Sequence, residues 1–328
     1  MSDSMFSKLE IDDSCCFLCG AESELITVEH VFPKWLQTKF NLWNKKLDLL
    51  NGTTIPYKSL KIPCCSSCNN NDLAHLESRV ASAITSGYEA CCRLDTHQWY
   101  LWVGKLFYGI LRKEIQLKRD RTKTSSEPIV PPKALDFFSN LHLFLQGILG
   151  SHEFVNRPPY SVLVCNLHNL GPGRNFGFRD NFHNMTVAIR MGSVGVIVAL
   201  EDGGVNKDSF GRYVTKVCGR KLYPIQFDEL YAKVTYQAYL IDTPVKYISA
   251  KNDADGSKVI SEVFGGLYIR DWSQKDFSGL LKVHVGDWLP EGGANTTWFA
   301  EPNLVPTWLI DHSGELLLQP LEAWEPRG

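Results

Sequence analysis

The spacing of apolar residues near the N-terminus predicts two strands followed by a helix. Residues 24–31 are rich in β-branched and apolar side chains, and residues 57–63 alternate between polar and apolar, so each segment predicts a strand. The polar residues 69–72 are of types that favour the N-cap of a helix, and apolar residues then recur at helical spacing from Leu73 to Val80. The pattern therefore predicts a small strand, strand, helix unit.

The remaining pattern mixes helical and strand-like segments. Residues 34–50, between the two strands, have the spacing of an inserted amphipathic helix. Helices are predicted over 97–118, 133–149 and 226–240, a strand over 161–167, a hairpin over 185–200, strand-like segments over 258–290, and a loop over 122–128 before Pro131-Pro132. The sequence thus predicts an α+β fold. We expect an N-terminal unit at residues 1–90 and a larger mixed domain at residues 91–328, with a helical segment at 97–149.

Length and composition are those of an ordinary globular protein. The 328 residues favour two domains, and 44% hydrophobic with 21% charged residues provide ample core. The first residues lack a basic stretch followed by an apolar one, and no apolar run reaches the roughly 18 residues of a membrane span. We therefore expect a cytoplasmic protein with no membrane association.

Two Cys-x-x-Cys pairs stand out among the ten cysteines: Cys16 with Cys19, and Cys65 with Cys68. Two such pairs can close a tetrahedral zinc site with no open position. Cys15 and Cys64 adjoin the pairs and leave open a shifted ligand set with three intervening residues. Because neighbouring cysteines seldom reach a common disulfide partner, the doublets favour reduced thiols and metal.

An acidic residue and a histidine, Glu29-His30, lie between the two cysteine pairs, and Asn69 directly follows the second pair. Over about residues 15–80 this arrangement resembles the HNH endonucleases of the ββα-metal superfamily. In that family, cysteine knuckles flank an acid-His dipeptide, and the second knuckle leads into an Asn or His that opens a helix. The resemblance implies an N-terminal ββα-metal domain with a structural zinc.

The resemblance also implies a role for each of these residues. His30 would be the general base that activates water, and Glu29 and Asn69 would bind a catalytic Mg²⁺ or Mn²⁺. Glu77, two helical turns after Asn69, is either a further carboxylate near the metal or part of a solvated network. Leu60 stands where the family has a middle Asn, so another group must orient His30.

Positive charge is concentrated locally although the net charge is only −2. Lysines surround the Glu29-His30 dipeptide, and four of them are candidates for phosphate contacts: Lys34, Lys45, Lys46 and Lys58. A second basic run, residues 112–123, is equally well explained as a solvated surface. Local patches are sufficient for phosphate neutralisation, so DNA is the expected partner.

The expected function is metal-dependent hydrolysis of phosphodiester bonds in DNA, by an endonuclease of the kind found in phage defence and restriction. Two other interpretations stay open, namely a zinc-stabilised module that binds nucleic acid without cleaving it and a protein-interaction module. Both treat the zinc as structural and His30 as an ordinary histidine at a strand end. The 91–328 domain would recognise substrate, a partner protein or an activating ligand.

Overall fold

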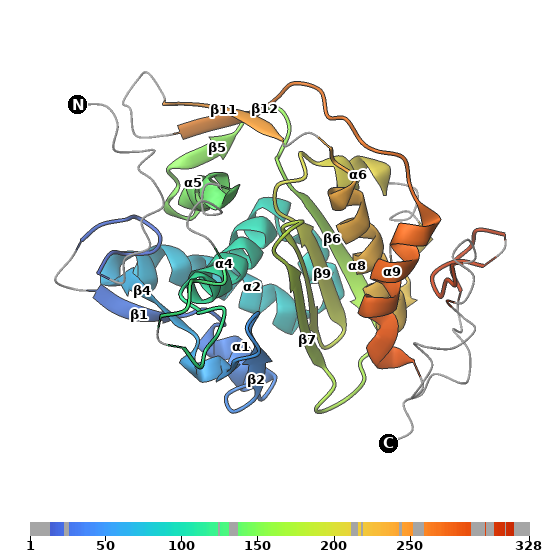
Figure 1. The fold of residues 1–328 in the computed structure, drawn as a ribbon, viewed down its shortest axis with the longest axis horizontal. Coiled ribbons are helices and arrows are strands. Elements are labelled where there is room, and N and C mark those ends of the chain that lie inside the picture. Colours follow the sequence, from blue (N-terminus) through green and yellow to red (C-terminus); the bar gives the residue numbers. More distant parts are fainter. Residues whose placement is uncertain are drawn as a thin grey trace. The chain divides into compact units, whose positions relative to one another are not determined.

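The protein is a mixed α and β structure, as expected (Figure 1). The computed structural model describes residues 14–22, 26–123, 125–130, 137–210, 216–217, 219–242, 245–251, 259–289, 299, 305–311 and 313–317. The chain divides into two compact units. The first comprises Met1–Ser86, Arg93–Asn156 and Ile248–Glu262, and the second comprises Gly87–Cys92, Arg157–Tyr247 and Val263–Gly328.

The first unit contains the predicted site. Its strands are β1 (Ile26–His30), β2 (Lys46–Asp48), β3 (Thr54–Pro56), β4 (Lys61–Cys65) and β5 (His152–Phe154). Its helices are α1 (Lys34–Lys39), α2 (Ala74–Ser86), α4 (Thr96–Ile115) and α5 (Ser139–Leu145), with 3-10 turns at Tyr57–Ser59 and Gln146–Leu149. β11 (Lys246–Lys251) and β12 (Val259–Phe264) lie mainly in this unit and form a sheet in the order β11-β12-β5.

The two predicted strands and the helix after the second cysteine pair are present. β1 pairs antiparallel with β4, with Ile26 opposite Cys65 and His30 opposite Lys61. The 3-10 turn at Tyr57–Ser59 delays the second strand, which therefore begins later than predicted. A six-residue π-helix, Cys68–Leu73, follows β4 and continues directly as α2.

The helix predicted over 34–50 is wrong beyond its first turns. α1 ends at Lys39, and Asn41 adopts a left-handed backbone conformation with φ of 52°. Asn tolerates that conformation better than most residues and commonly ends a helix. The chain then forms the antiparallel pair β2–β3, in which Leu47 lies opposite Ile55.

The long helix α4 is the core of the first unit. It begins at the N-cap Asp95, whose side chain accepts a hydrogen bond from the His97 backbone N–H. Its side chains are buried on nearly all sides, which marks an interior helix rather than a surface one. The helix predicted over 133–149 is shorter, because α5 ends at Leu145 and a 3-10 turn follows; residues 131–136 lie outside the described residues.

The second unit is built on a five-stranded sheet in the order β10-β6-β9-β8-β7. Its strands are β6 (Ser161–Leu167), β7 (Phe176–Asn181), β8 (Thr186–Met191), β9 (Val194–Ala199) and β10 (Lys221–Leu222). Its helices are α3 (Tyr88–Arg93, apart from its last residue), α6 (Val205–Ser209), α8 (Pro224–Tyr239) and α9 (Gln274–Val285), with a 3-10 turn at Gly286–Trp288.

The predicted hairpin at 185–200 is confirmed as β8–β9, and the helix predicted over 226–240 is confirmed as α8. α8 packs on this sheet through a core that includes Phe227 and Tyr231 (Figure 1). The strand-like prediction for 258–290 holds only for β12. α9 forms instead, because Ser273 caps it and Phe277, Leu281 and Val285 recur every four residues on the buried face.

Candidate functional site

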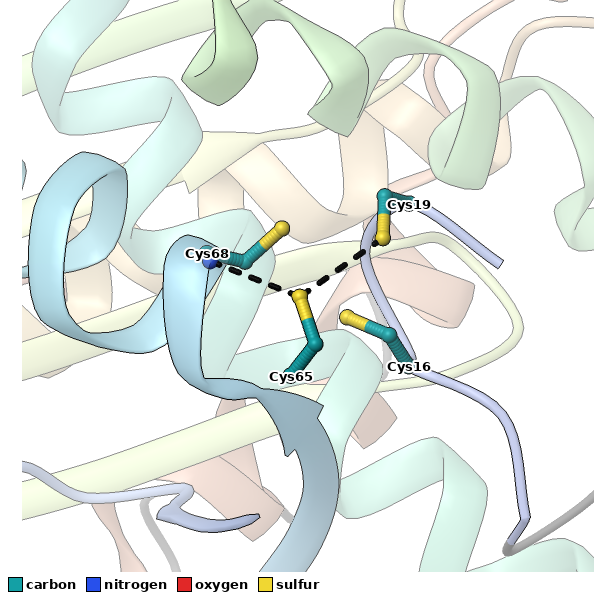
Figure 2. A group of neighbouring side chains, drawn as sticks. All are labelled: Cys16, Cys19, Cys65 and Cys68. Atoms are coloured by element: carbon teal, nitrogen blue, oxygen red, sulfur yellow. Dashed lines mark hydrogen bonds between the residues drawn. The ribbon is translucent and has the colours of Figure 1, made fainter. Parts of the chain in front are cut away.

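The sulfur atoms of four cysteines converge in the first unit, as predicted. Cys16 and Cys19 lie in the loop before β1, Cys65 ends β4, and Cys68 opens the π-helix (Figure 2). All four Sγ atoms lie within 4.8 Å of one another. Within the described residues, this is the only group of three or more His, Cys, Asp or Glu side chains positioned to share a metal ion.

The spacing of these sulfurs fits a zinc ion. Tetrahedral Zn–S bonds of about 2.3 Å place the sulfurs about 3.8 Å apart, and Sγ of Cys19 lies 3.8 Å from Sγ of Cys65. The Cys68 backbone N–H also donates to Sγ of Cys65 at 3.5 Å, which stabilises a thiolate. The set can therefore hold a structural zinc that joins the first loop to the start of the helix.

The cysteine pKa values show how a cation would change the ionisation of this cluster. A hydrogen bond with the Cys64 side chain lowers the pKa of Cys16 to about 4. Burial raises the pKa of Cys19 to about 11 and also raises the pKa of Cys68. One thiolate forms readily but its neighbours resist ionising beside it. A divalent ion reverses this, because it favours deprotonation of every coordinating thiol.

The shifted ligand set is not the one that the structure assembles. Cys64 is buried, and its Sγ accepts a hydrogen bond from the Cys16 thiol at 4.0 Å, so Cys64 is a neighbour of the cluster rather than a member. Cys15 contacts the hydroxyl of Ser14 and also lies outside the group.

Glu29 and His30 occupy the end of β1, and both are largely buried, with 8% and 9% of their surface exposed. Pro33, the N-cap of α1, lacks a backbone N–H and limits extension of the strand. The antiparallel register places Glu29 opposite Ile62 and His30 opposite Lys61. The acid-His dipeptide is thus held by its pairing with β4 on one side and by the start of α1, a few residues later, on the other.

Lys105 of α4 is the main feature that the sequence did not reveal. Its side chain is fully buried, and its ammonium group lies 2.5 Å from Oε1 of Glu29 and 3.0 Å from Oε1 of Glu77. The ammonium also donates to the backbone carbonyls of His30 and Val31, at 2.8 and 3.1 Å. Glu29, which the resemblance links to a divalent ion, and Glu77, a candidate from its helical spacing, thus share a protein cation. The one available signal was a lysine within a strongly apolar helix.

The pKa values of this cluster reflect one cation between two acids. Burial by itself would lower the pKa of Lys105, but Glu77 and Glu29 outweigh it and raise the pKa. Burial raises the pKa of Glu77, and Glu29 adds to that rise against the pull of Lys105. A single ammonium fully compensates only one of the two carboxylates.

His30 has the properties of a neutral imidazole. Burial is the largest cause that lowers its pKa, and the positive charges of Lys61 and Lys34 lower it further. Its ring lies beside the ring of Trp43, with centroids 6.0 Å apart. Trp43 is itself 42% exposed. An unprotonated imidazole can accept a proton, as a general base must.

The Leu60 carbonyl and the Lys105 ammonium restrain the backbone next to His30. Leu60 is fully buried, and its backbone carbonyl accepts a hydrogen bond from the Val31 N–H at 3.0 Å. Together with the bonds from Lys105, this fixes the backbone on both sides of the histidine. Lys105 and Leu60 therefore restrain the backbone around His30.

Asn69 lies on the π-helix and contacts β1. Its amide donates to the Thr27 hydroxyl at 3.1 Å, and that hydroxyl donates to the Cys64 carbonyl at 2.7 Å. Thr27 and Glu29 are two residues apart on one strand, so their side chains lie on the same face. The π-helix between Asn69 and Glu77 departs from the regular helical spacing assumed from the sequence.

The four predicted phosphate-contact lysines differ in their surroundings. Lys34, Lys45 and Lys46 are exposed, whereas Lys58 is partly buried and donates to the Asn44 side chain at 2.8 Å. In the second basic run, Arg112 is buried in α4 and is therefore not part of a basic surface.

Comparisons with protein-family models, with curated proteins and with solved structures find no match to this chain. Among the helices that the structure describes, none has the length and apolar character needed to cross a membrane. We therefore infer function from the residues of the site.

Proposed function

We propose that the first unit is a nuclease of the HNH type, which hydrolyses phosphodiester bonds in DNA. The observation that carries this proposal is the cysteine cluster, which ties the loop before β1 to the start of the helix after β4. A closed zinc site there would hold Glu29 and His30 on a paired strand beside that helix. The acid-His pair would become rigid in this way.

His30 is the proposed general base. Its neutral imidazole takes a proton from water, and the resulting hydroxide attacks the phosphorus of the scissile bond as the bond from phosphorus to the leaving 3′ oxygen breaks. Lys34, Lys45 and Lys46 are exposed and would contact neighbouring phosphates. Lys105 is a positioning residue here, since it holds the carbonyls of His30 and Val31 rather than the substrate.

The Mg²⁺ or Mn²⁺ of this proposal would be held by oxygen atoms left over from the contacts described above. Lys105 engages Oε1 of Glu29, and the amide nitrogen of Asn69 donates to Thr27. Oε2 of Glu29 and Oδ1 of Asn69 are the atoms that remain to coordinate a metal, and carboxylate and amide oxygens suit hard cations. Such an ion would stabilise negative charge that develops on the phosphate.

One observation favours a second function, a zinc-stabilised module that binds nucleic acid without cleaving it. The Lys105 ammonium already lies between Glu29 and Glu77, so positive charge is present where the divalent ion would be needed. A second cation close to it would be repelled. In this alternative Glu29, Lys105 and Glu77 form a structural cluster and His30 has no chemical role.

Replacement of His30 separates the two functions. Purified protein is incubated with plasmid and single-stranded DNA in Mg²⁺, Mn²⁺ or EDTA. The nuclease proposal expects cleavage that depends on divalent ions and falls about a hundredfold or more in His30→Ala, the usual contribution of a general base. Zinc content and DNA affinity should stay unchanged. His75→Ala, an exposed histidine on α2, is the matched control and should cleave normally.

Two results would favour the alternative. If the wild type binds DNA but cleaves neither substrate under any ion condition, the binding module is the better description. If His30→Ala cleaves as fast as the wild type, the chemistry lies elsewhere in the chain.

A further inference from the structure

The second unit contains a polar cavity that has no part in the proposed nuclease site. It has a volume of about 230 Å³ and lies where β7 and β8 face the start of α8 and the 3-10 turn after α9. Its charged lining residues are Arg179, Arg190, Asp228 and Asp287. Small-molecule sites are concave and carry a few placed polar groups, and a cavity of this size and polarity would suit only a small, polar ligand.

One of the two arginines is already neutralised by its neighbours. Arg179 lies 2.6 Å from the Asp287 carboxylate and 3.6 Å from the Asp228 carboxylate. Asp228 is buried and also accepts a hydrogen bond from the Trp288 indole at 2.6 Å. On this wall of the cavity, the charges of Arg179 and the two acids therefore compensate one another.

Arg190 is in a different situation. Among the residues that the structure describes, no carboxylate forms an ion pair with Arg190, and no acceptor takes a hydrogen bond from its guanidinium. Burial is the largest influence on its pKa and lowers it; the carboxylates of Asp228 and Asp287 act in the opposite direction without outweighing burial. A guanidinium has five N–H donors, and Arg190 is one of the residues that line the cavity.

The backbone is shaped to hold this guanidinium in place. Gly177 lies directly opposite Arg190 in the β7–β8 pair. A Cβ atom at Gly177 would come within 2.6 Å of an Arg190 nitrogen, so the guanidinium lies against the bare glycine backbone. Arg190 also lies 5.0 Å from the centroid of the Trp288 ring. Contacts on two sides orient the arginine without using its hydrogen-bond donors.

We propose that this cavity binds a small carboxylic acid, whose carboxylate forms a bidentate pair with Arg190. The planar fork of a guanidinium matches a carboxylate in two parallel hydrogen bonds. A carboxylate carries one negative charge. The doubly charged form of phosphate would be repelled more strongly by Asp228 and Asp287 in the same cavity, so a carboxylate is favoured over phosphate.

The test measures binding of simple probes to the full-length protein. Acetate and lactate are the singly charged probes, inorganic phosphate is the doubly charged one, and ionic strength is held constant. Calorimetric titration and thermal melting should give millimolar binding of acetate or lactate, since few atoms make the contact. Phosphate should bind this cavity more weakly. Because phosphate can also bind the lysines near His30, each probe is scored as the difference between wild type and Arg190→Gln.

Three variants define the outcome. Arg190→Gln should weaken acetate and lactate binding at least tenfold, and Gly177→Ala should weaken it with every charge retained, because the added methyl group displaces the guanidinium. Arg270→Gln is the matched control, since Arg270 also lies over an aromatic ring, Tyr239, in the same unit but outside the cavity. It should bind like the wild type.

Other results would overturn the proposal. If neither acetate nor lactate binds the wild type, or if both bind Arg190→Gln equally well, the cavity is not a carboxylate site. If Arg190→Gln instead melts at a lower temperature than wild type without any probe, and no probe shifts the wild type, Arg190 is only a structural partner of Trp288. If phosphate alone shows the difference between the variants, the ligand class is wrong.

Discussion

At the scale of single residues, Lys105 decides how the candidate site is held together. Moving an ammonium group out of water costs several kcal/mol unless charges and hydrogen bonds compensate it. Four oxygen atoms do so here, from Glu29, Glu77, His30 and Val31. The same contacts link α4 to β1 and to α2, so one side chain couples the core helix to the site.

Replacement of Lys105 should therefore destabilise the protein strongly. Lys105→Met leaves the buried carboxylate of Glu29 and the partly buried carboxylate of Glu77 without a cation, and breaking a buried pair in this way costs about 3–5 kcal/mol. Urea unfolding of the zinc-loaded protein measures the change. Lys39→Met is the control, because Lys39 donates a hydrogen bond to Thr85 on the surface. Its replacement should change the free energy of unfolding by less than about 0.5 kcal/mol. Equal stability of the Lys105→Met and Lys39→Met variants would contradict a compensating role for the lysine.

A buried histidine, His152, should make stability depend on pH. Burial, together with nearby His97, lowers the pKa of His152 to about 4 from 6.5. Both of its ring nitrogens are buried without a hydrogen-bond partner among the described residues. As pH falls from 6.5 towards 4, the unfolded chain binds a proton that the folded ring resists. Stability is therefore retained above pH 6.5 and lost below it, by at most about 1.4 kcal/mol per pH unit.

His152→Phe removes this dependence while preserving ring contacts with Phe144 and Phe154. Denaturant unfolding at pH 7.5, 6, 5 and 4.5 should show a shallower loss of stability in the variant. Parallel losses in the two proteins would mean that His152 titrates normally in the folded state.

At the scale of elements, the sequence allowed prediction where the signal is local. The Cys-x-x-Cys spacing specified the four cysteines that converge, and β1 and β4 were recognisable from their side chains. The Glu29–Lys105 contact joins residues 76 positions apart in the sequence, and no local sequence pattern predicts such a pair. The predicted helix at 34–50 failed because Asn41 turns the chain, and α9 was missed because its apolar residues were interpreted as strand-like.

Zinc should be what joins these elements. A structural zinc contributes on the order of 10 kcal/mol to folding, and here it would link the loop before β1, the end of β4 and the π-helix. Cys68→Ser should lower zinc content and expose residues 15–80 to protease, as judged by metal analysis and limited proteolysis. Cys15→Ser is the matched control, since Cys15 lies outside the cluster, and should keep one zinc per chain. One zinc retained in Cys68→Ser would rule out this ligand set.

At the scale of the whole molecule, the net charge is small, and positive charge is concentrated in two short stretches of the chain. A net charge of −2 gives no general attraction to nucleic acid, so any DNA binding must come from a restricted surface. Lys45 and Lys46 are exposed beside Trp43, whose ring lies next to His30. The exposed part of the second basic run, which includes Lys118 and Arg119, provides an internal comparison of similar charge.

The two lysines beside Trp43 should therefore carry more of the DNA affinity than the second basic run. Each phosphate contact releases counterions, so the double variant Lys45→Glu, Lys46→Glu should bind DNA more weakly and lower the salt-dependence slope by about one unit per lost contact. Titration of labelled DNA at several salt concentrations measures both quantities. The same double change at Lys118 and Arg119 removes equal charge at a different place. If that variant loses affinity and slope to the same extent, binding follows overall charge, and the surface around His30 has no special part in it.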